Sequence, residues 1–190
     1  MIVKEKHNTK SYQNIPINKK IFNKYKSVRE IFDSEKIVYK NKIKLNKKII
    51  ELKKYNLTKL NLKDLKKLAN FIFNKYNISN EFINNDSVII VSKSGINESI
   101  EKIYFNNRQR KLLKEHLQVF SVLGNIIENA TLVNQIKEVK KRNDIYYWNY
   151  YIDGLIINNK EYKMEFDVRS MQDGQNQYRI QRIEENKKAN

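Results

Sequence analysis

The sequence predicts an α+β chain in which N-terminal helices precede a four-stranded antiparallel sheet. Three observations support this fold class. Apolar residues recur at helical spacing in residues 61–76 and again in residues 108–129. After residue 130 the apolar period changes to two, and turn-forming residues separate the alternating segments. Hydrophobic residues make up 40% of the chain, which is enough to build a core.

The first part of the chain is predicted to be a basic extension. Residues 1–18 are polar without periodicity and indicate an arm, whereas residues 19–32 follow a 3.6-residue period and indicate a helix. Residues 36–56 alternate lysine with apolar residues, so a strand and a basic helix both fit. We expect residues 1–58 to form this extension, largely helical or partly disordered, and residues 59–190 to form the main domain.

The main domain is predicted to begin with helices. Asn61 is a good N-cap for a helix that runs to Tyr76. A turn at residues 84–86 and a short buried strand at residues 88–91 follow. Two helices are expected next, residues 95–105 and the long segment 108–129, whose apolar side chains recur on one face.

The second half of the main domain is predicted to be the sheet. The candidate strands are residues 131–139, 145–157, 160–169 and 176–183. Asn, Asp and Gly residues between them favour tight hairpin turns. Short turns between consecutive strands indicate an antiparallel meander, with the helices packed on one of its faces.

The charge of the chain points to a polyanionic partner. The formal net charge is +17 and the pI is 9.8. Residues 1–80 contain 21 Lys and Arg against 6 Asp and Glu, whereas residues 81–190 contain 17 against 15. Codon bias in a low-GC genome would explain many of the lysines, but not the scarcity of acidic residues in the first part. The charge therefore favours RNA, or DNA bound through the extension.

Several chemistries are excluded by composition. The chain has no cysteine, which excludes disulfides, thiolate zinc sites and cysteine catalysis. Its two histidines are too few for a histidine-based metal centre, although carboxylates could still hold a magnesium ion. We expect no metal site and no cofactor. No segment has the roughly 20 apolar residues that span a bilayer, and the start lacks a secretory signal. We expect a cytoplasmic protein that binds no membrane, unless it is delivered elsewhere by phage or by injection.

The strands offer a polar face with candidate binding residues. Period-two alternation places Tyr146, Trp148 and Tyr150 on the apolar face, together with Met164 and Phe166. The opposite, outward face is expected to carry tyrosines, Asn149, carboxylates and arginines: Tyr147, Asn149, Tyr151, Glu165, Asp167, Arg169, Arg179 and Gln181. In the last strand, we expect Tyr178 and Ile180 to be buried. The outward face can be an ordinary solvated surface or a nucleic-acid platform, in which tyrosines stack bases and arginines hold phosphates.

Two further features allow both a structural and a functional interpretation. Lys93 and Ser94 precede Gly95 at a strand-to-helix junction, where backbone amides can bind an anion. The same residues can instead form a capping turn, with Ser94 as the N-cap. His116 lies beside the apolar face of the long helix and is either a buried structural residue or an acid–base catalyst.

The order of these features resembles a known nuclease group. The run Val91-Ser92-Lys93-Ser94-Gly95-Ile96 precedes two helices, the second ending in Gly124-Asn125-Ile126-Ile127-Glu128-Asn129. The strands then carry Trp148, Asp153-Gly154 and the closing runs Tyr162-Lys163-Met164-Glu165-Phe166-Asp167-Val168-Arg169 and Tyr178-Arg179-Ile180. Over roughly residues 65–185 the chain resembles the barnase–EndoU–colicin E5/D–RelE-like (BECR) nuclease domains, found in large polyvalent and MuF-type phage proteins.

The resemblance implies a metal-independent endoribonuclease toxin of phage or mobile-element origin. A base deprotonates a ribose 2′-OH, the oxyanion attacks the adjacent phosphate, cations stabilise the charge, and an acid protonates the leaving 5′-oxygen. Such a toxin would have an immunity or antitoxin protein as partner. This chain lacks the paired histidines of some relatives. The alternatives are a non-catalytic module that binds nucleic acid or protein, and a structural phage component that contacts packaged DNA.

Specific residues can be assigned to this reaction as hypotheses. Arg169 and Arg179 are candidates for stabilising phosphate charge, with Lys93 and Ser94 anchoring the RNA backbone. His116, or Asp167 in its place, is the acid–base candidate. The remaining candidates would contact or stack bases: Tyr147, Asn149, Tyr151 and Tyr178.

Overall fold

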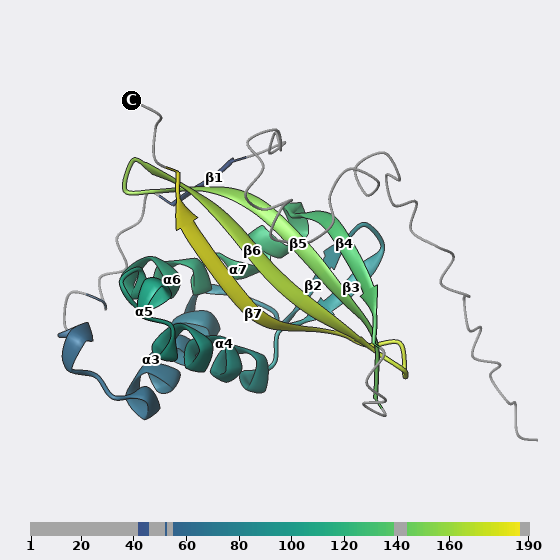
Figure 1. Ribbon diagram of the computed structural model, residues 1–190, viewed down its shortest axis with the longest axis horizontal. Helices are drawn as coiled ribbons and strands as arrows, with labels where there is room; N and C mark the ends of the chain where they lie inside the picture. Colours follow the sequence, from purple (N-terminus) through teal and green to yellow (C-terminus); the bar gives the residue numbers. More distant parts are fainter. Residues whose placement is uncertain (1–41, 46–51, 53–54, 139–143, 187–190) are drawn as a thin grey trace, which may run out of the picture.

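The computed structural model describes residues 42–45, 52, 55–138 and 144–186 (Figure 1). The expected arm at residues 1–18 and the helix at residues 19–32 lie outside these ranges. The helices are η2 (Leu57–Lys59, a 3₁₀ turn), α3 (Leu62–Tyr76), α4 (Lys93–Phe105), α5 (Asn107–Arg110), α6 (Leu113–Phe120) and α7 (Leu123–Asn129). The strands are β1 (Lys42–Leu45), β2 (Glu81–Asn84), β3 (Ser87–Ile90), β4 (Thr131–Lys137), β5 (Ile145–Ile157), β6 (Lys160–Met171) and β7 (Asn176–Glu185).

The sheet differs from the predicted one, although the chain is α+β. Within the described part of the chain it has seven strands in the order β1-β5-β6-β7-β3-β2, and β4 also pairs with β5. The pairs β1–β5 and β3–β7 are parallel and the others antiparallel, so the sheet is mixed. The expectation of four antiparallel strands preceded by helices is therefore wrong. The long strands β5, β6 and β7 curl together like half of a barrel (Figure 1).

The error has a physical cause. Antiparallel hairpins leave turn residues in the sequence, whereas parallel partners that are far apart in the chain leave no local sign. The β4–β7 meander was found because each connection is short. Strand β3 instead reaches β7 only through the pairs Ile89–Asn176 and Ile90–Gln177. Strand β1 lies in the range assigned to the extension and pairs with β5; the boundary near residue 58 itself stays a prediction.

The tight turns follow the local chemistry of asparagine and aspartate. Asn85 and Asp86 have φ of 45° and 68°, and Asn158 and Asn159 have φ of 52° and 65°. Two consecutive left-handed residues are what a two-residue hairpin turn requires, and Asn and Asp tolerate this conformation. The first pair joins β2 to β3, a hairpin of which only the second strand was expected.

The predicted long helix at residues 108–129 is three short helices. The turns between them are closed by backbone hydrogen bonds from Leu112 N to the Gln109 carbonyl and from Val122 N to the Val119 carbonyl. The Ser121 hydroxyl also donates to the Gln118 carbonyl at 2.7 Å, which competes with continuation of the helix. The apolar periodicity continues through these turns because α6 and α7 bury their apolar residues in the same core.

The helices cover one face of the sheet, and the core lies between the two layers (Figure 1). Asn61 caps α3 as predicted, with its side chain accepting from Asp64 N. Helix α4 packs on both α3 and β7. The buried residues from the sheet include Tyr151, Leu155, Ile157, Met164, Phe166, Val168, Tyr178 and Ile183. In the described residues no helix has the length and apolarity to cross a membrane.

Candidate functional site

A group of charged side chains gathers where α4 meets the sheet, on the face of β6 that points away from the core. We call Glu98, Asp167, Arg169 and Arg179 the arginine–carboxylate cluster. Arg179 Nε donates to Glu98 Oε1 at 2.6 Å, and its Nη1 lies 3.7 Å from Asp167 Oδ2. Arg169 Nη2 lies 3.6 Å from Glu98 Oε2. The cluster thus joins two arginines through one carboxylate.

An irregularity in β7 sets the position of Arg179. The β6–β7 register shifts between Asp167, which pairs with Ile180, and Val168, which pairs with Tyr178. Arg179 is the extra residue of this β-bulge. The Ile180 N–H donates to Asp167 Oδ1 at 2.9 Å, so the carboxylate itself supports the bulge. The bulge explains why Gln181, expected to point outward, is buried.

Helix α4 is fixed against the same bulge, which places Glu98. A Cβ at Gly95 would collide with the Tyr178 carbonyl oxygen, so only glycine permits this approach. One turn later the Ser99 hydroxyl accepts from Gln181 N at 3.3 Å. Glu98, between these two contacts, is therefore held at the edge of β7.

The electrostatics of the cluster favour proton transfer and anion binding. Burial raises the pKa of Asp167 to about 6, and Arg179 opposes this shift. The Asp167 side chain is 15% exposed, whereas those of Arg169 and Arg179 are about 20% exposed. Arg169 Nε is buried and has no hydrogen-bond partner among the residues that the structure describes. A buried donor without an acceptor is costly, so an anion bound at this position would satisfy it.

Aromatic residues adjoin the cluster, but not the ones predicted. The Arg179 guanidinium lies over the Trp148 ring, 4.8 Å from its centre, and Trp148 Nε1 donates to Glu138 Oε2 at 2.7 Å. Tyr150 pairs with Asp167 across the strands. Both Trp148 and Tyr150 are half-buried. They lie on the polar face, whereas their period-two alternation predicted that they lie on the apolar face.

The two faces of β5 were therefore assigned the wrong way round. Tyr151, expected to point outward, is buried and stacks on Phe166 with ring centres 5.2 Å apart; burial raises its pKa to about 12. Both faces of β5 carry large apolar side chains, so alternation alone cannot decide which is inside. The pairing with β6, whose faces were predicted correctly, decides it. Tyr151 lies directly opposite Phe166.

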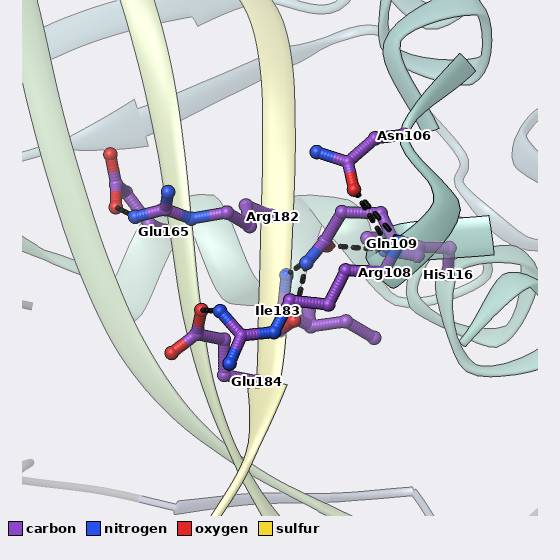
Figure 2. Close-up of polar contacts among 8 residues, drawn as sticks. All are labelled: Asn106, Arg108, Gln109, His116, Glu165, Arg182, Ile183 and Glu184. Carbon is purple, nitrogen blue, oxygen red and sulfur yellow. Dashed lines mark hydrogen bonds and ion pairs between the residues drawn. The ribbon is translucent and has the colours of Figure 1, made fainter. Parts of the chain in front are cut away.

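His116 lies in the core instead of the cluster. It is 0% exposed, and burial lowers its pKa to about 3. Nε2 donates to Gln109 Oε1 at 2.9 Å, and Nδ1 accepts from Gln181 Nε2 at 3.1 Å, which assigns a neutral ring protonated at Nε2. Gln109 also bonds both backbone groups of Ile183 (Figure 2). These residues form a closed network that ties α5 and α6 to β7.

Three other predicted binding residues are on the core side of the sheet. Tyr178 is 0% exposed, and its hydroxyl donates to Gln181 Oε1 at 3.0 Å; burial raises its pKa. Asn149 is buried and donates to Ser170 Oγ at 2.6 Å. Tyr147, half-buried, packs edge-on against Tyr146. Of these, only Tyr147 retains a surface that another molecule could reach.

Lys93 and Ser94 begin α4 and are both exposed. The N-cap is Ser92, whose hydroxyl accepts from Gly95 N at 3.1 Å, and not Ser94 as expected. Ser94 lies one turn before Glu98 and so shares its side of the helix, whereas Lys93 shares a side with Asn97, which bonds Asn70 of α3. Of the predicted site residues, Asp167, Arg169 and Arg179 are thus brought together, with Ser94 on the facing side of α4.

Sequence reasoning missed Glu98 and Trp148 as members of this site. Glu98 was not among the predicted site residues, and Trp148 was predicted to be a core residue. No local pattern marks either, because Glu98 meets its arginines across 71 and 81 residues of chain. In the described ranges no group of three or more His, Asp or Glu could hold a metal ion.

The sequence of the chain matches a known protein family. Residues 60–178 match the model of the family described as large polyvalent protein-associated domain 3. No curated protein and no solved structure matches the chain. The matched segment contains the whole arginine–carboxylate cluster except the last residue, Arg179, and it supports the expected association with large polyvalent phage proteins. Because the match covers more than half of the sequence, the chain belongs to the large polyvalent protein-associated domain 3 family.

Proposed function

We propose that this domain is a metal-independent endoribonuclease, toxin-like in character, that cleaves RNA by 2′-OH attack at the arginine–carboxylate cluster. The observation that carries the proposal is the combination of Asp167, whose pKa is raised to about 6, with Arg169 and Arg179 beside it. A base with a pKa near neutral and two fixed cations are the groups that phosphoryl transfer to a ribose hydroxyl needs.

Asp167 is the general base in this proposal. Near neutral pH most of its carboxyl is ionised, and its proton affinity exceeds that of an ordinary aspartate because of burial. It accepts the proton of the ribose 2′-OH as that oxygen bonds to phosphorus. His116 takes no part, because it is enclosed in the core and lies outside reach of solvent.

Arg169 and Arg179 stabilise the phosphorane. In the free protein Glu98 binds both guanidinium groups, and its side chain is 29% exposed. The pair between Arg169 and Glu98 is long, at 3.6 Å, so a phosphate diester can displace the carboxylate from Arg169. Arg169 Nε, buried without a partner, gives the phosphate one bond that Glu98 does not already occupy.

The leaving 5′-oxygen takes its proton from Tyr150. This residue lies opposite Asp167 on β5, and burial together with Asp167 and Glu165 raises its pKa, so that the hydroxyl stays protonated. The products are a 2′,3′-cyclic phosphate and a 5′-hydroxyl. Trp148, two pairs further along β5 and beneath Arg179, offers a ring on which a base can stack.

The test is cleavage of a labelled RNA by wild type and by Asp167→Asn, in the presence of EDTA. Wild type should cleave in chelator and leave cyclic phosphates, and Asp167→Asn should be slower by about 10²-fold or more. A strand with 2′-deoxyribose at the cut should resist cleavage. Cleavage of that strand, or dependence on Mg²⁺, would contradict the proposal. No cleavage with retained RNA binding would favour a non-catalytic binding module.

A further inference from the structure

A second region combines cations, an exposed aromatic ring and a hollow, and it lies away from the cluster. We call the α5 surface the five residues Phe105, Arg108, Arg110, Lys111 and Lys114. All five are exposed, and Phe105 is 70% exposed, the largest exposure of any aromatic side chain in the described residues. They follow one another from the end of α4 to the start of α6.

The cations of this surface are available for a ligand. Neither Lys111 nor Lys114 forms an ion pair within the part of the chain that the structure describes. Arg110 lies over the Tyr104 ring at 4.3 Å, which leaves its charge accessible. Arg108 is 77% exposed and lies 3.7 Å from Glu184, a distance at which solvent screens the pair (Figure 2). A phosphate can therefore displace Glu184 from Arg108 at small cost.

A cleft of about 620 Å³ adjoins the α5 surface. Leu112 is the partly exposed apolar residue of its lining, and the cleft is also lined by the cations Arg108 and Lys163 and by the carboxylates Glu184 and Glu185. The size is within the range of small-ligand sites, and a nucleoside fits it. The apolar side chain of Leu112 suits a base, and the cations Arg108 and Lys163 suit its phosphates, whereas a bare anion would gain nothing from Leu112.

The wall of the cleft is rigid. Gln109 is fixed by three side-chain hydrogen bonds, two to Ile183 and one to His116 (Figure 2). The Asn106 side chain accepts from both Arg108 N and Gln109 N, which holds the turn before α5. A preorganised wall does not have to be ordered on binding, so less binding energy is lost there.

We infer that the α5 surface and its cleft bind single-stranded nucleic acid. The cations contact the phosphate backbone, the exposed ring of Phe105 stacks on an unpaired base, and the cleft receives one nucleotide. This inference does not depend on cleavage at the arginine–carboxylate cluster. Strand β7 connects the two regions, since Arg179 lies near its start and Glu184 near its end.

The experiment measures the binding of a fluorescent 12-nucleotide 2′-O-methyl RNA, which cannot be cleaved by 2′-OH attack, through its anisotropy at several salt concentrations. The double variant Lys111→Gln/Lys114→Gln should bind more weakly, and its slope of log affinity against log salt should fall by about 1.4, for two phosphate contacts on a single strand. Lys63→Gln/Lys67→Gln is the matched control: both lysines are exposed on α3, and their loss should leave the slope unchanged.

The aromatic ring and the cleft are tested in the same assay. Phe105→Ala should weaken binding by about 5- to 100-fold, as loss of one stacked base does, whereas the control Phe71→Ala, at a position 49% exposed on α3, should not. Leu112→Trp should fill the cleft and weaken binding. Leu60→Trp, which fills the smaller hollow beside α3, is its control. Thermal melting verifies that each variant is folded.

The outcomes separate the two proposals. Equal affinity for duplex and single strand, or equal effects of the α5 variants and their α3 controls, would overturn the inference by reducing it to general charge. Weaker binding in Arg169→Ala, with unchanged binding in every α5 variant, would overturn it while leaving the proposed function intact. A DNA strand of the same sequence should bind comparably, because cations and stacking do not read the sugar.

Discussion

The arginine–carboxylate cluster and the His116 network both include residues of β7, the cluster where it meets α4 and the network where it meets α5 and α6, yet they are built in opposite ways. In the network each polar atom of Gln109 has a partner, His116 is neutral and the side chains are sealed from water. In the cluster Asp167 has a raised pKa, Arg169 Nε lacks an acceptor, and the side chains are partly exposed. A buried network in which the hydrogen bonds are satisfied stabilises the fold. Partly exposed charged groups with a shifted pKa can instead bind a ligand or transfer a proton.

The two regions are nonetheless one piece of structure. Ser99 and Tyr178, which bond Gln181 of the network, are the chain neighbours of Glu98 and Arg179 in the cluster. The network thus fixes the backbone from which the cluster side chains extend. Loss of Arg169 from the cluster should therefore affect ligand chemistry more than stability, and changes in the network should do the reverse.

The largest effect is expected from Arg169→Ala. Removing one fixed transition-state cation should slow RNA cleavage by about 10²-fold or more. The free energy of unfolding should change by less than about 1 kcal/mol, because truncation removes a long ion pair with Glu98 but also removes a buried Nε that lacks an acceptor. Cleavage rates and urea denaturation of the same preparation measure both. A strongly destabilised variant would mean that the cluster belongs to the fold as much as the network does.

His116→Ala should have the opposite signature. The truncation leaves a cavity and removes a hydrogen-bond partner of Gln109 and of Gln181. The free energy of unfolding should therefore be about 2–4 kcal/mol lower than that of wild type at pH 7.5. This difference in stability between the variant and wild type should become smaller as the pH falls from 6.5 toward 3. In that interval the unfolded wild type takes up a proton that its folded form, with a pKa of about 3, cannot. Denaturation at pH 7.5 and pH 5 tests this, and a constant deficit would show that His116 is not buried as a neutral ring.

Part of the fold and of the candidate site could be predicted from the sequence. Strands β5, β6 and β7 were predicted to within two residues because hairpin turns and alternation are local signals. The polar face of β6, with Asp167 and Arg169, followed from the same alternation. The bulge at Arg179, the phase of β5 and the parallel pairs of β1 and β3 depend on contacts between distant segments, which no spacing records. Glu98 joined the site for the same reason, through arginines on two later strands.

A smaller effect is expected from Asp167→Asn on stability. The folded pKa of about 6 exceeds the unfolded value of 3.8, so ionised Asp167 destabilises the fold at pH 7 and ceases to do so as the pH falls through 6 toward 4. The neutral amide can still accept from Ile180 N. The variant should be more stable than wild type by up to about 3 kcal/mol at pH 7.5, since the pKa differs by about two units and each unit corresponds to about 1.4 kcal/mol. At pH 4 the two should be equal. Lower stability of the variant at pH 7.5 would show that the ion pair with Arg179 outweighs burial.

The smallest effect is expected from Trp148→Phe. A core tryptophan would cost several kcal/mol on truncation, but Trp148 is half-buried on the outer face, and phenylalanine keeps a ring under the Arg179 guanidinium. What is lost is the bond to Glu138 and part of the cation–π attraction. We therefore expect a loss of less than about 1 kcal/mol in the free energy of unfolding, and a reduction in RNA affinity of only a few fold, since phenylalanine still stacks a base. Because Trp148 is the only tryptophan of the chain, its fluorescence gives an independent measure of RNA binding at the cluster in the wild type. Quenching of this fluorescence by a bound uncleavable RNA should be abolished by Arg169→Ala. It should be retained in Lys111→Gln/Lys114→Gln at saturating RNA concentration. A destabilisation of 3 kcal/mol or more would return Trp148 to the core, and with it the face of β5 on which the cluster depends.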